Sequence, residues 1–168
     1  MQGTDDFPFV SEPAGAFSFK PGCSAKSSGT IASIPQRELD ITLRHNDLQL
    51  ALHAHLSAKY GNNAVGTETV TIKGCKIDAV VRHENNSYWF YEIKTAFSAR
   101  VCIREALAQL MEYSFWPGAQ EAERLIIIGE AVLDESSKRF LELLRNRFAI
   151  PIYYQQFDTA AGSLIEPA

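Results

Sequence analysis

The sequence predicts an α/β protein in which helices sandwich a central mixed β-sheet. Three observations support this class. Three candidate strands follow one another between residues 64 and 94, separated only by short polar turns. The run "RLIIIGE", residues 124–130, is continuously apolar and β-branched, as in a strand covered on both faces. Helical patterns flank both groups, so the expected order is α-β-β-β-α-β-α-β.

Residues 1–35 are predicted to form an irregular N-terminal arm, and residues 36–168 to form one domain. The arm is rich in Gly, Ser, Pro and Phe and shows no sustained period. The first helix is expected from about residue 44 to residue 60, because its apolar residues recur at three- and four-residue spacing and Gly61 ends it. The preceding "ELDITL" alternates like a strand, so the sequence leaves the start of this helix open.

The remaining elements follow from turn and cap residues. Strands are predicted at about residues 64–72, 75–82 and 87–94. A helix follows at about residues 99–115 and ends at "WPG", because neither proline nor glycine continues a helix. Asp134 would cap a further helix that reaches about Phe148. The segment "IPIYYQQF" then supplies the last strand.

Charged residues interrupt the stretch "KIDAVVRHENNSYWFYEIKTA", which is otherwise typical of two buried strands. Glu92 and Lys94 lie two residues apart in the second strand and therefore point to the same face. If residues 83–87 form the turn, Asp78 lies opposite Glu92, with the two side chains roughly 5 Å apart. Facing carboxylates repel each other unless a cation lies between them, and their oxygens are the ligands that Mg²⁺ and Mn²⁺ prefer. Lys94 would then orient or deprotonate a water molecule.

A structural salt bridge is the alternative interpretation of the same residues. In it, Lys94 pairs with Glu92 or Asp78 at a solvated edge of the sheet. The apolar flanks "AVV" and "YWFY" favour a functional site instead, because buried charged groups are costly to keep.

The arrangement of an acid on one strand and Glu-x-Lys on the next resembles the signature of the PD-(D/E)XK nuclease superfamily. The following helix carries "REALAQLMEYS", which resembles the Gln-x-x-x-Tyr motif of RecB-like members. The resemblance covers about residues 44–130. It implies a three-layer restriction-endonuclease-like sandwich in which Asp78 and Glu92 bind the metal and Lys94 serves the hydrolytic water.

Four side chains of the helix expected at residues 99–115 are candidates for contact with nucleic acid. Gln109 and Tyr113 lie four residues apart on one helical face, and the resemblance implies that they line the site and contact nucleic acid. Arg100 and Arg104 share a helical stripe from which they could meet phosphates. A solvated helix face is the alternative for the two arginines.

Further metal ligands are sought on the first helix and the first strand. RecB-like nucleases have a histidine ligand on the first core helix, which His45 matches by its position on the apolar stripe. His53 and His55 are the alternatives. Gln49, one turn beyond His45, would hold the second nitrogen of its ring. Glu68 is another candidate ligand, provided that its strand borders the strand of the first carboxylate.

The sequence therefore predicts a Mg²⁺- or Mn²⁺-dependent deoxyribonuclease that hydrolyses DNA phosphodiester bonds, in defence, restriction or repair. One alternative is a catalytically silent nucleic-acid-binding or scaffold module with the same fold. Another is an unrelated α/β protein with a chance trio of charges, which would have no metal affinity. The net charge of −4 counts mildly against a nucleic-acid substrate, although a bound cation can invert the local potential.

The expected partners are DNA and a divalent cation. No apolar run approaches the roughly 20 residues that span a bilayer, so no membrane association is expected. The acidic start "MQGTDDFPFVSEP" lacks the features of a signal peptide, which predicts a cytoplasmic location. The sequence leaves open a homodimer, an association with a larger protein or complex, the form of the DNA, and endonuclease or exonuclease action.

Overall fold

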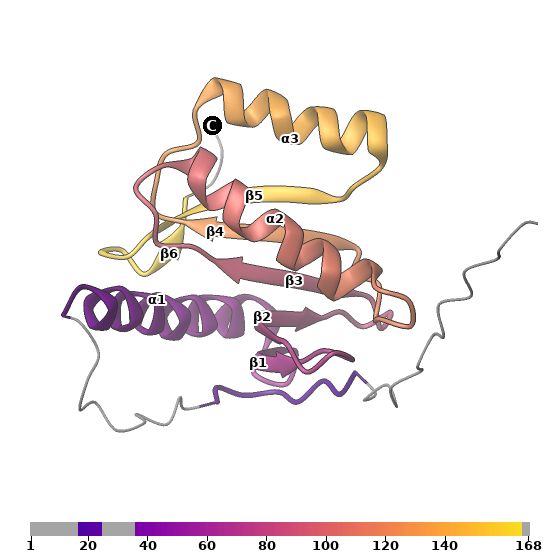
Figure 1. Cartoon of the computed structure of the whole chain (residues 1–168). Helices are drawn as coiled ribbons and strands as arrows, with labels where there is room; N and C mark the ends of the chain where they lie inside the picture. Colours follow the sequence, from indigo (N-terminus) through magenta and orange to yellow (C-terminus); the bar gives the residue numbers. More distant parts are fainter. Residues whose placement is uncertain (1–16, 25–35, 166–168) are drawn as a thin grey trace, which may run out of the picture.

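The computed structural model describes residues 17–24 and 36–165, and within them three helices and one six-stranded sheet (Figure 1). The elements are α1 (Gln36–Tyr60), β1 (Val65–Val70), β2 (Lys76–Arg82), β3 (Tyr88–Ile93), α2 (Ala99–Phe115), β4 (Arg124–Gly129), α3 (Glu135–Phe148), β5 (Ile152–Asp158) and β6 (Ser163–Leu164). The predicted α/β class with a mixed sheet is confirmed. The two-residue strand β6 was not predicted, because so short a segment carries no period.

The sheet has the spatial order β1-β2-β3-β4-β5-β6. Strands β1, β2 and β3 are antiparallel neighbours, whereas β3, β4 and β5 run parallel to one another, and β6 returns antiparallel to β5. Parallel neighbours need a crossover connection, which α2 supplies between β3 and β4 and α3 between β4 and β5.

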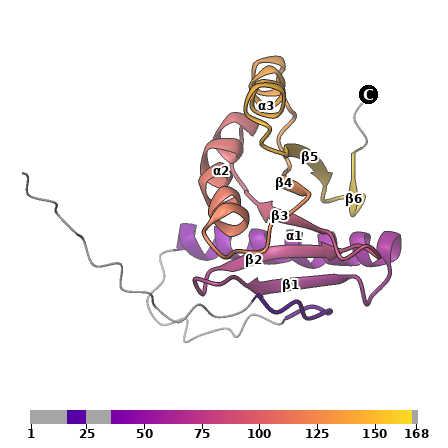
Figure 2. The same cartoon turned by 90° about the vertical axis from the view of Figure 1, so that its right-hand side faces the viewer.

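The helices cover both faces of the sheet. The first cluster of buried residues joins α2 and α3 to one face, and the second joins α1 to the other. Figure 2 shows α2 and α3 together on one side of β3, β4 and β5. The apolar run of β4 follows from this arrangement, since Leu125 and Ile127 face α2 while Ile126 and Ile128 face α1.

The helix ends answer one question that the sequence left open and confirm one predicted cap. Because α1 begins at Gln36, the segment "ELDITL" is helical rather than a strand. At the start of α3, Asp134 is the cap, and its Oδ1 accepts a hydrogen bond from the Ser137 N–H at 3.0 Å. Within the described part of the chain, none of the helices combines the length and the apolarity that crossing a membrane requires.

The described part of the predicted N-terminal arm lies along the edge of the sheet. The Gly22 N–H donates to the Val65 carbonyl at 2.9 Å, and the Gly22 carbonyl accepts from the Thr67 N–H at 3.1 Å. These bonds partly cover the outer edge of β1. The rest of the predicted arm, residues 1–16 and 25–35, lies outside the described residues.

Candidate metal-binding and catalytic site

The β2–β3 hairpin brings the two predicted carboxylates together. Residues 79–82 pair with residues 88–91, which confirms the predicted register and, one step further, sets Asp78 across from Glu92. The ladder itself stops before this step. Instead, the Ile93 N–H donates to Asp78 Oδ2 at 2.8 Å, so the Asp78 side chain takes the place of a strand partner.

Glu92 is a buried acid with an incomplete set of partners. Its side chain is 5% exposed; Oε1 accepts a hydrogen bond from Lys94 Nζ at 2.7 Å, while Oε2 is buried with no hydrogen-bond partner in the described part of the chain. Burial, and next the nearby Asp78 carboxylate, raise the pKa of Glu92 to about 7, against the opposing effect of Lys94. A cation beside Oε2 would satisfy this oxygen and favour the ionised form.

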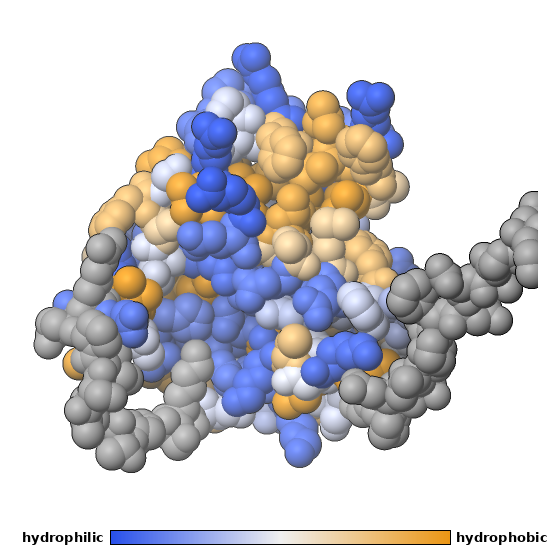
Figure 3. Space-filling view, in the orientation of Figure 1, coloured by the Kyte–Doolittle hydropathy of each residue, from blue (hydrophilic) through white to orange (hydrophobic). Residues whose placement is uncertain are grey.

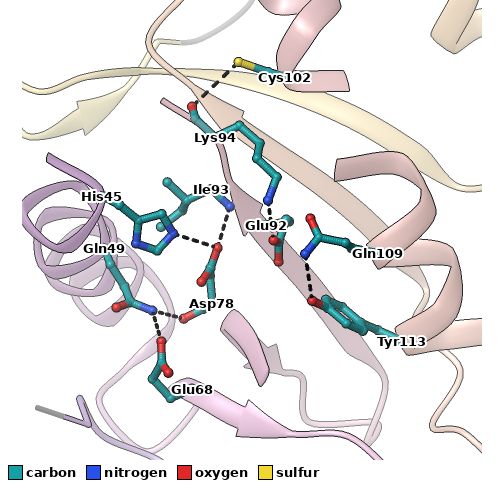
Figure 4. A network of polar contacts seen from close by, with 10 residues as sticks. All are labelled: His45, Gln49, Glu68, Asp78, Glu92, Ile93, Lys94, Cys102, Gln109 and Tyr113. Carbon is teal, nitrogen blue, oxygen red and sulfur yellow. Dashed lines mark hydrogen bonds and ion pairs between the residues drawn. The ribbon is translucent and has the colours of Figure 1, made fainter. Parts of the chain in front are cut away.

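The first helix contributes a histidine to the same place. His45 Nε2 lies 3.2 Å from Asp78 Oδ2, so the predicted ligand does meet the predicted carboxylate (Figure 4). The two alternative histidines contact other groups. His53 lies beside a serine one turn further along α1, and His55 packs edge-on against the ring of Phe157. The geometry therefore favours His45 among the three.

Glu68 is tied to the site through an amide. Its strand borders the Asp78 strand, as its candidacy required. Gln49 Nε2 donates to Glu68 Oε1 at 2.9 Å and to the Asp78 carbonyl at 2.8 Å, and Lys76 Nζ lies 3.3 Å from Glu68 Oε2. Gln49 thus links α1 to β1 and β2. Its position on the buried stripe predicted that it faces the core, but not which groups it contacts. Its predicted role beside His45 stays a prediction.

The second helix presents the predicted Gln-x-x-x-Tyr pair to the acids. Gln109 Nε2 donates to the Tyr113 hydroxyl at 3.5 Å, and both lie on the opposite side of Glu92 from His45 in Figure 4. Burial raises the pKa of Tyr113, and the charges of the Glu92 and Asp78 carboxylates raise it further. The Tyr113 phenol, which accepts the hydrogen bond from Gln109, is therefore neutral at neutral pH.

Arg100 and Arg104 lie on another side of α2. They line a groove of about 540 Å³ between α2 and α3, together with Ile103, Leu107 and other mainly apolar residues. Figure 3 shows hydrophobic residues gathered over this part of the molecule. Because Arg104 and Gln109 are five residues apart, they point roughly 140° from each other around the helix. The structure does not bring the two arginines to the carboxylates, and their contact with nucleic acid stays a prediction.

The described part of the chain offers few donors for a divalent cation at this site. Among residues 17–24 and 36–165, no group of three or more His, Cys, Asp or Glu side chains is arranged to hold a metal ion. Mg²⁺, however, usually keeps several water ligands and is bound by one or two carboxylates together with substrate phosphates. The pair Asp78 and Glu92, with the unpartnered Glu92 Oε2, fits this smaller requirement.

The raised pKa of Glu92 predicts a pH-dependent stability in the absence of metal. The folded state keeps a proton on Glu92 that the unfolded state, with the ordinary pKa of 4.5, has released. The free energy of unfolding should therefore fall as the pH rises from about 4.5 to about 7, by on the order of 1–3 kcal/mol. Urea unfolding in EDTA at several pH values, for the wild type and Glu92→Gln, measures this slope.

The variant isolates the contribution of Glu92. Glu92→Gln should lack this part of the pH dependence and be the more stable protein at pH 8. Millimolar Mn²⁺ should stabilise the wild type most above pH 7, where the folded state would otherwise hold an unfavourable charge. Equal slopes in the two proteins, with no effect of Mn²⁺ on either, would contradict the assignment.

Comparison of the chain with protein-family models, with curated proteins and with solved structures finds no match.

Proposed function

We propose that this chain is a metal-dependent nuclease that hydrolyses DNA phosphodiester bonds. The observation that carries the proposal is the meeting of Asp78 and Glu92 on adjacent strands, with Lys94 hydrogen-bonded to the second acid. These are the three residues that the PD-(D/E)XK resemblance assigns to catalysis. Gln109 and Tyr113, the second motif, lie beside Glu92 in Figure 4.

We further propose that the fold is the three-layer restriction-endonuclease-like sandwich. Two features support it. The described elements α1 to β4 follow the order α-β-β-β-α-β, which the superfamily core is expected to have. Helices also cover both faces of the sheet, with α1 on the face opposite to α2 and α3.

In the proposed reaction, Asp78 and Glu92 would hold Mg²⁺ or Mn²⁺, with His45 beside Asp78 as a further donor. When bound, the cation lowers the pKa of the attacking water and offsets charge on the phosphate oxygens. Lys94, which is hydrogen-bonded to Glu92, would orient this water or donate a hydrogen bond to the phosphate. The phenol of Tyr113, which burial keeps protonated, would donate a hydrogen bond to the DNA backbone.

A catalytically silent nucleic-acid-binding module is the second candidate. One observation favours it, namely that the described residues offer no group of three or more His, Cys, Asp or Glu side chains for a metal ion. The Glu92 Oε2 atom weighs against it, because a buried oxygen without a hydrogen-bond partner is costly and a bound cation would remove this cost.

Cleavage assays decide between the two candidates. Supercoiled plasmid, linear duplex and single-stranded DNA are incubated with Mg²⁺, Mn²⁺ or EDTA. The matched control for Glu92→Gln is Glu135→Gln, an acid on α3 with a 67% exposed side chain. We expect metal-dependent cleavage by the wild type and the control, and none by Glu92→Gln. DNA binding without cleavage in any metal would favour the silent module.

A further inference from the structure

Phe97 is the most exposed of the large hydrophobic residues in the described chain. It lies between Lys94 and the start of α2, and its relative exposure is 92%. Single exposed apolar side chains are common, so exposure alone indicates no function. The neighbour of the ring is more informative, since the guanidinium of Arg44 lies 5.7 Å from the ring centroid.

Arg44 is an oriented arginine rather than a freely moving one. Its Nε donates to Glu130 Oε2 at 2.7 Å, although the side chain stays 47% exposed. Glu130 is itself fixed, because its Oε1 accepts a hydrogen bond from Thr159 Oγ1 at 2.6 Å. The chain segments that follow β4 and β5 thus hold the guanidinium in place while leaving part of it open to solvent.

The Arg44–Phe97 pair stands at the margin of the candidate site. Arg44 directly precedes His45 on α1, and the His45 ring contacts the Asp78 carboxylate. Phe97 follows Lys94 by three residues, a span of at most roughly 11 Å. The pair therefore joins α1 next to His45 to the loop that follows Lys94.

An exposed aromatic ring and an oriented guanidinium match two parts of a single-stranded nucleotide. Any base can stack on an aromatic ring, but a base inside a duplex already has both faces covered by its neighbours. The planar guanidinium matches the phosphate group. We propose that Phe97 stacks on an unpaired base and Arg44 holds a neighbouring phosphate, so that the substrate is single-stranded DNA. This inference rests on the proposed nuclease function.

The test of stacking uses oligonucleotides that contain 2-aminopurine, whose fluorescence is quenched when it stacks. Binding is measured in EDTA, so that it does not depend on cleavage. We expect the wild type to bind a single strand more tightly than the duplex and to quench the probe. Phe97→Leu, which keeps apolar volume without a π face, should weaken single-strand binding roughly tenfold and abolish the added quenching. Phe97→Tyr should restore both properties.

Control variants separate stacking from general effects. Phe148→Leu removes another exposed phenylalanine, 56% exposed at the end of α3, and should bind like the wild type. Arg44→Gln should reduce the slope of log K against log salt by about 0.7, as expected for one lost phosphate contact to a single strand. Equal losses in Phe97→Leu and Phe148→Leu, or no binding of the single strand by the wild type, would overturn the inference.

The same proteins in Mn²⁺ distinguish failure of the inference from failure of the proposed function. If the wild type cleaves single strands and Phe97→Leu cleaves them much more slowly, the inference and the proposed function are both supported. If the wild type cleaves DNA but Phe97→Leu cleaves single strands equally well, the nuclease stands and the role of Phe97 is rejected. If no DNA is cleaved while binding and quenching depend on Phe97, the stacking role of Phe97 is supported and the proposed nuclease function is rejected.

Discussion

Asp78→Asn is expected to lower the rate of metal-dependent DNA cleavage by on the order of 10³-fold or more, while the protein stays folded. Substitution of groups that merely support a metal ligand commonly costs 10–100-fold, so loss of a charged ligand should cost more. The amide oxygen of Asn can still accept the Ile93 N–H, which Asp78 Oδ2 now accepts at 2.8 Å. The end of the β2–β3 ladder should therefore survive, and only the charge is lost.

The stability of Asp78→Asn distinguishes the two interpretations of the charged trio. In EDTA the variant should be as stable as the wild type or more so, because the repulsion between Asp78 and Glu92 is removed and the pKa of Glu92 falls. A loss of more than about 2 kcal/mol would instead favour the alternative interpretation, in which the charged residues form a structural salt bridge. Asp158→Asn is the matched control, since Asp158 also accepts backbone N–H groups, in a turn.

The hairpin register was predictable from the sequence because it depends on local features. A polar turn at residues 83–87 fixes which residues pair, and side-chain alternation then fixes their faces. Asp78 and Glu92 were found in this way. The contact between Asp78 and the Ile93 N–H was not, because alternation assumes a regular ladder and the ladder ends just before these residues.

Contacts between elements distant in the chain were harder to predict from the sequence. The apolar spacing in α1 predicted that His45 and Gln49 face the core, and the structure brings both to the Asp78 strand. Spacing cannot say which strand a helix packs against, so the bond from Gln49 to Glu68 was missed. Glu68 also has a left-handed backbone with φ 53°, a local irregularity that no hydrophobic pattern reports in a non-glycine residue.

The position of the two arginines on α2 could have been obtained from the sequence. Arg104 and Gln109 are five residues apart, which by helical geometry puts them on different sides of the helix. The groove that the arginines line needed the structure, because it also depends on α3. Periodicity thus predicts the orientation of side chains about one element, whereas a shared site depends on how several elements pack.

Lys94→Met is expected to reduce cleavage by roughly 10²–10⁴-fold, the usual contribution of a group that transfers or positions a proton. Methionine keeps most of the apolar stem and removes the ammonium group that donates to Glu92 Oε1 at 2.7 Å. Metal binding should not fall in parallel. Without the ammonium, no positive charge competes for Glu92, so Mn²⁺ should raise the melting temperature of the variant at least as much as that of the wild type.

A second measurement on Lys94→Met tests whether the lysine acts through Glu92. Lys94 lowers the pKa of Glu92, so its removal should move that pKa above its present value of about 7. In EDTA, the pH range over which stability falls should then extend further upward, because the folded state keeps its proton to higher pH.

Lys76→Met is the matched control. It removes a lysine near Glu68 whose side chain is 60% exposed, and should change neither cleavage nor this pH range. Normal cleavage by Lys94→Met would leave Lys94 with only the structural role of its salt bridge. If cleavage is lost but the pH range of the stability change is the same as in the wild type, Lys94 acts on the water or the phosphate and not through Glu92.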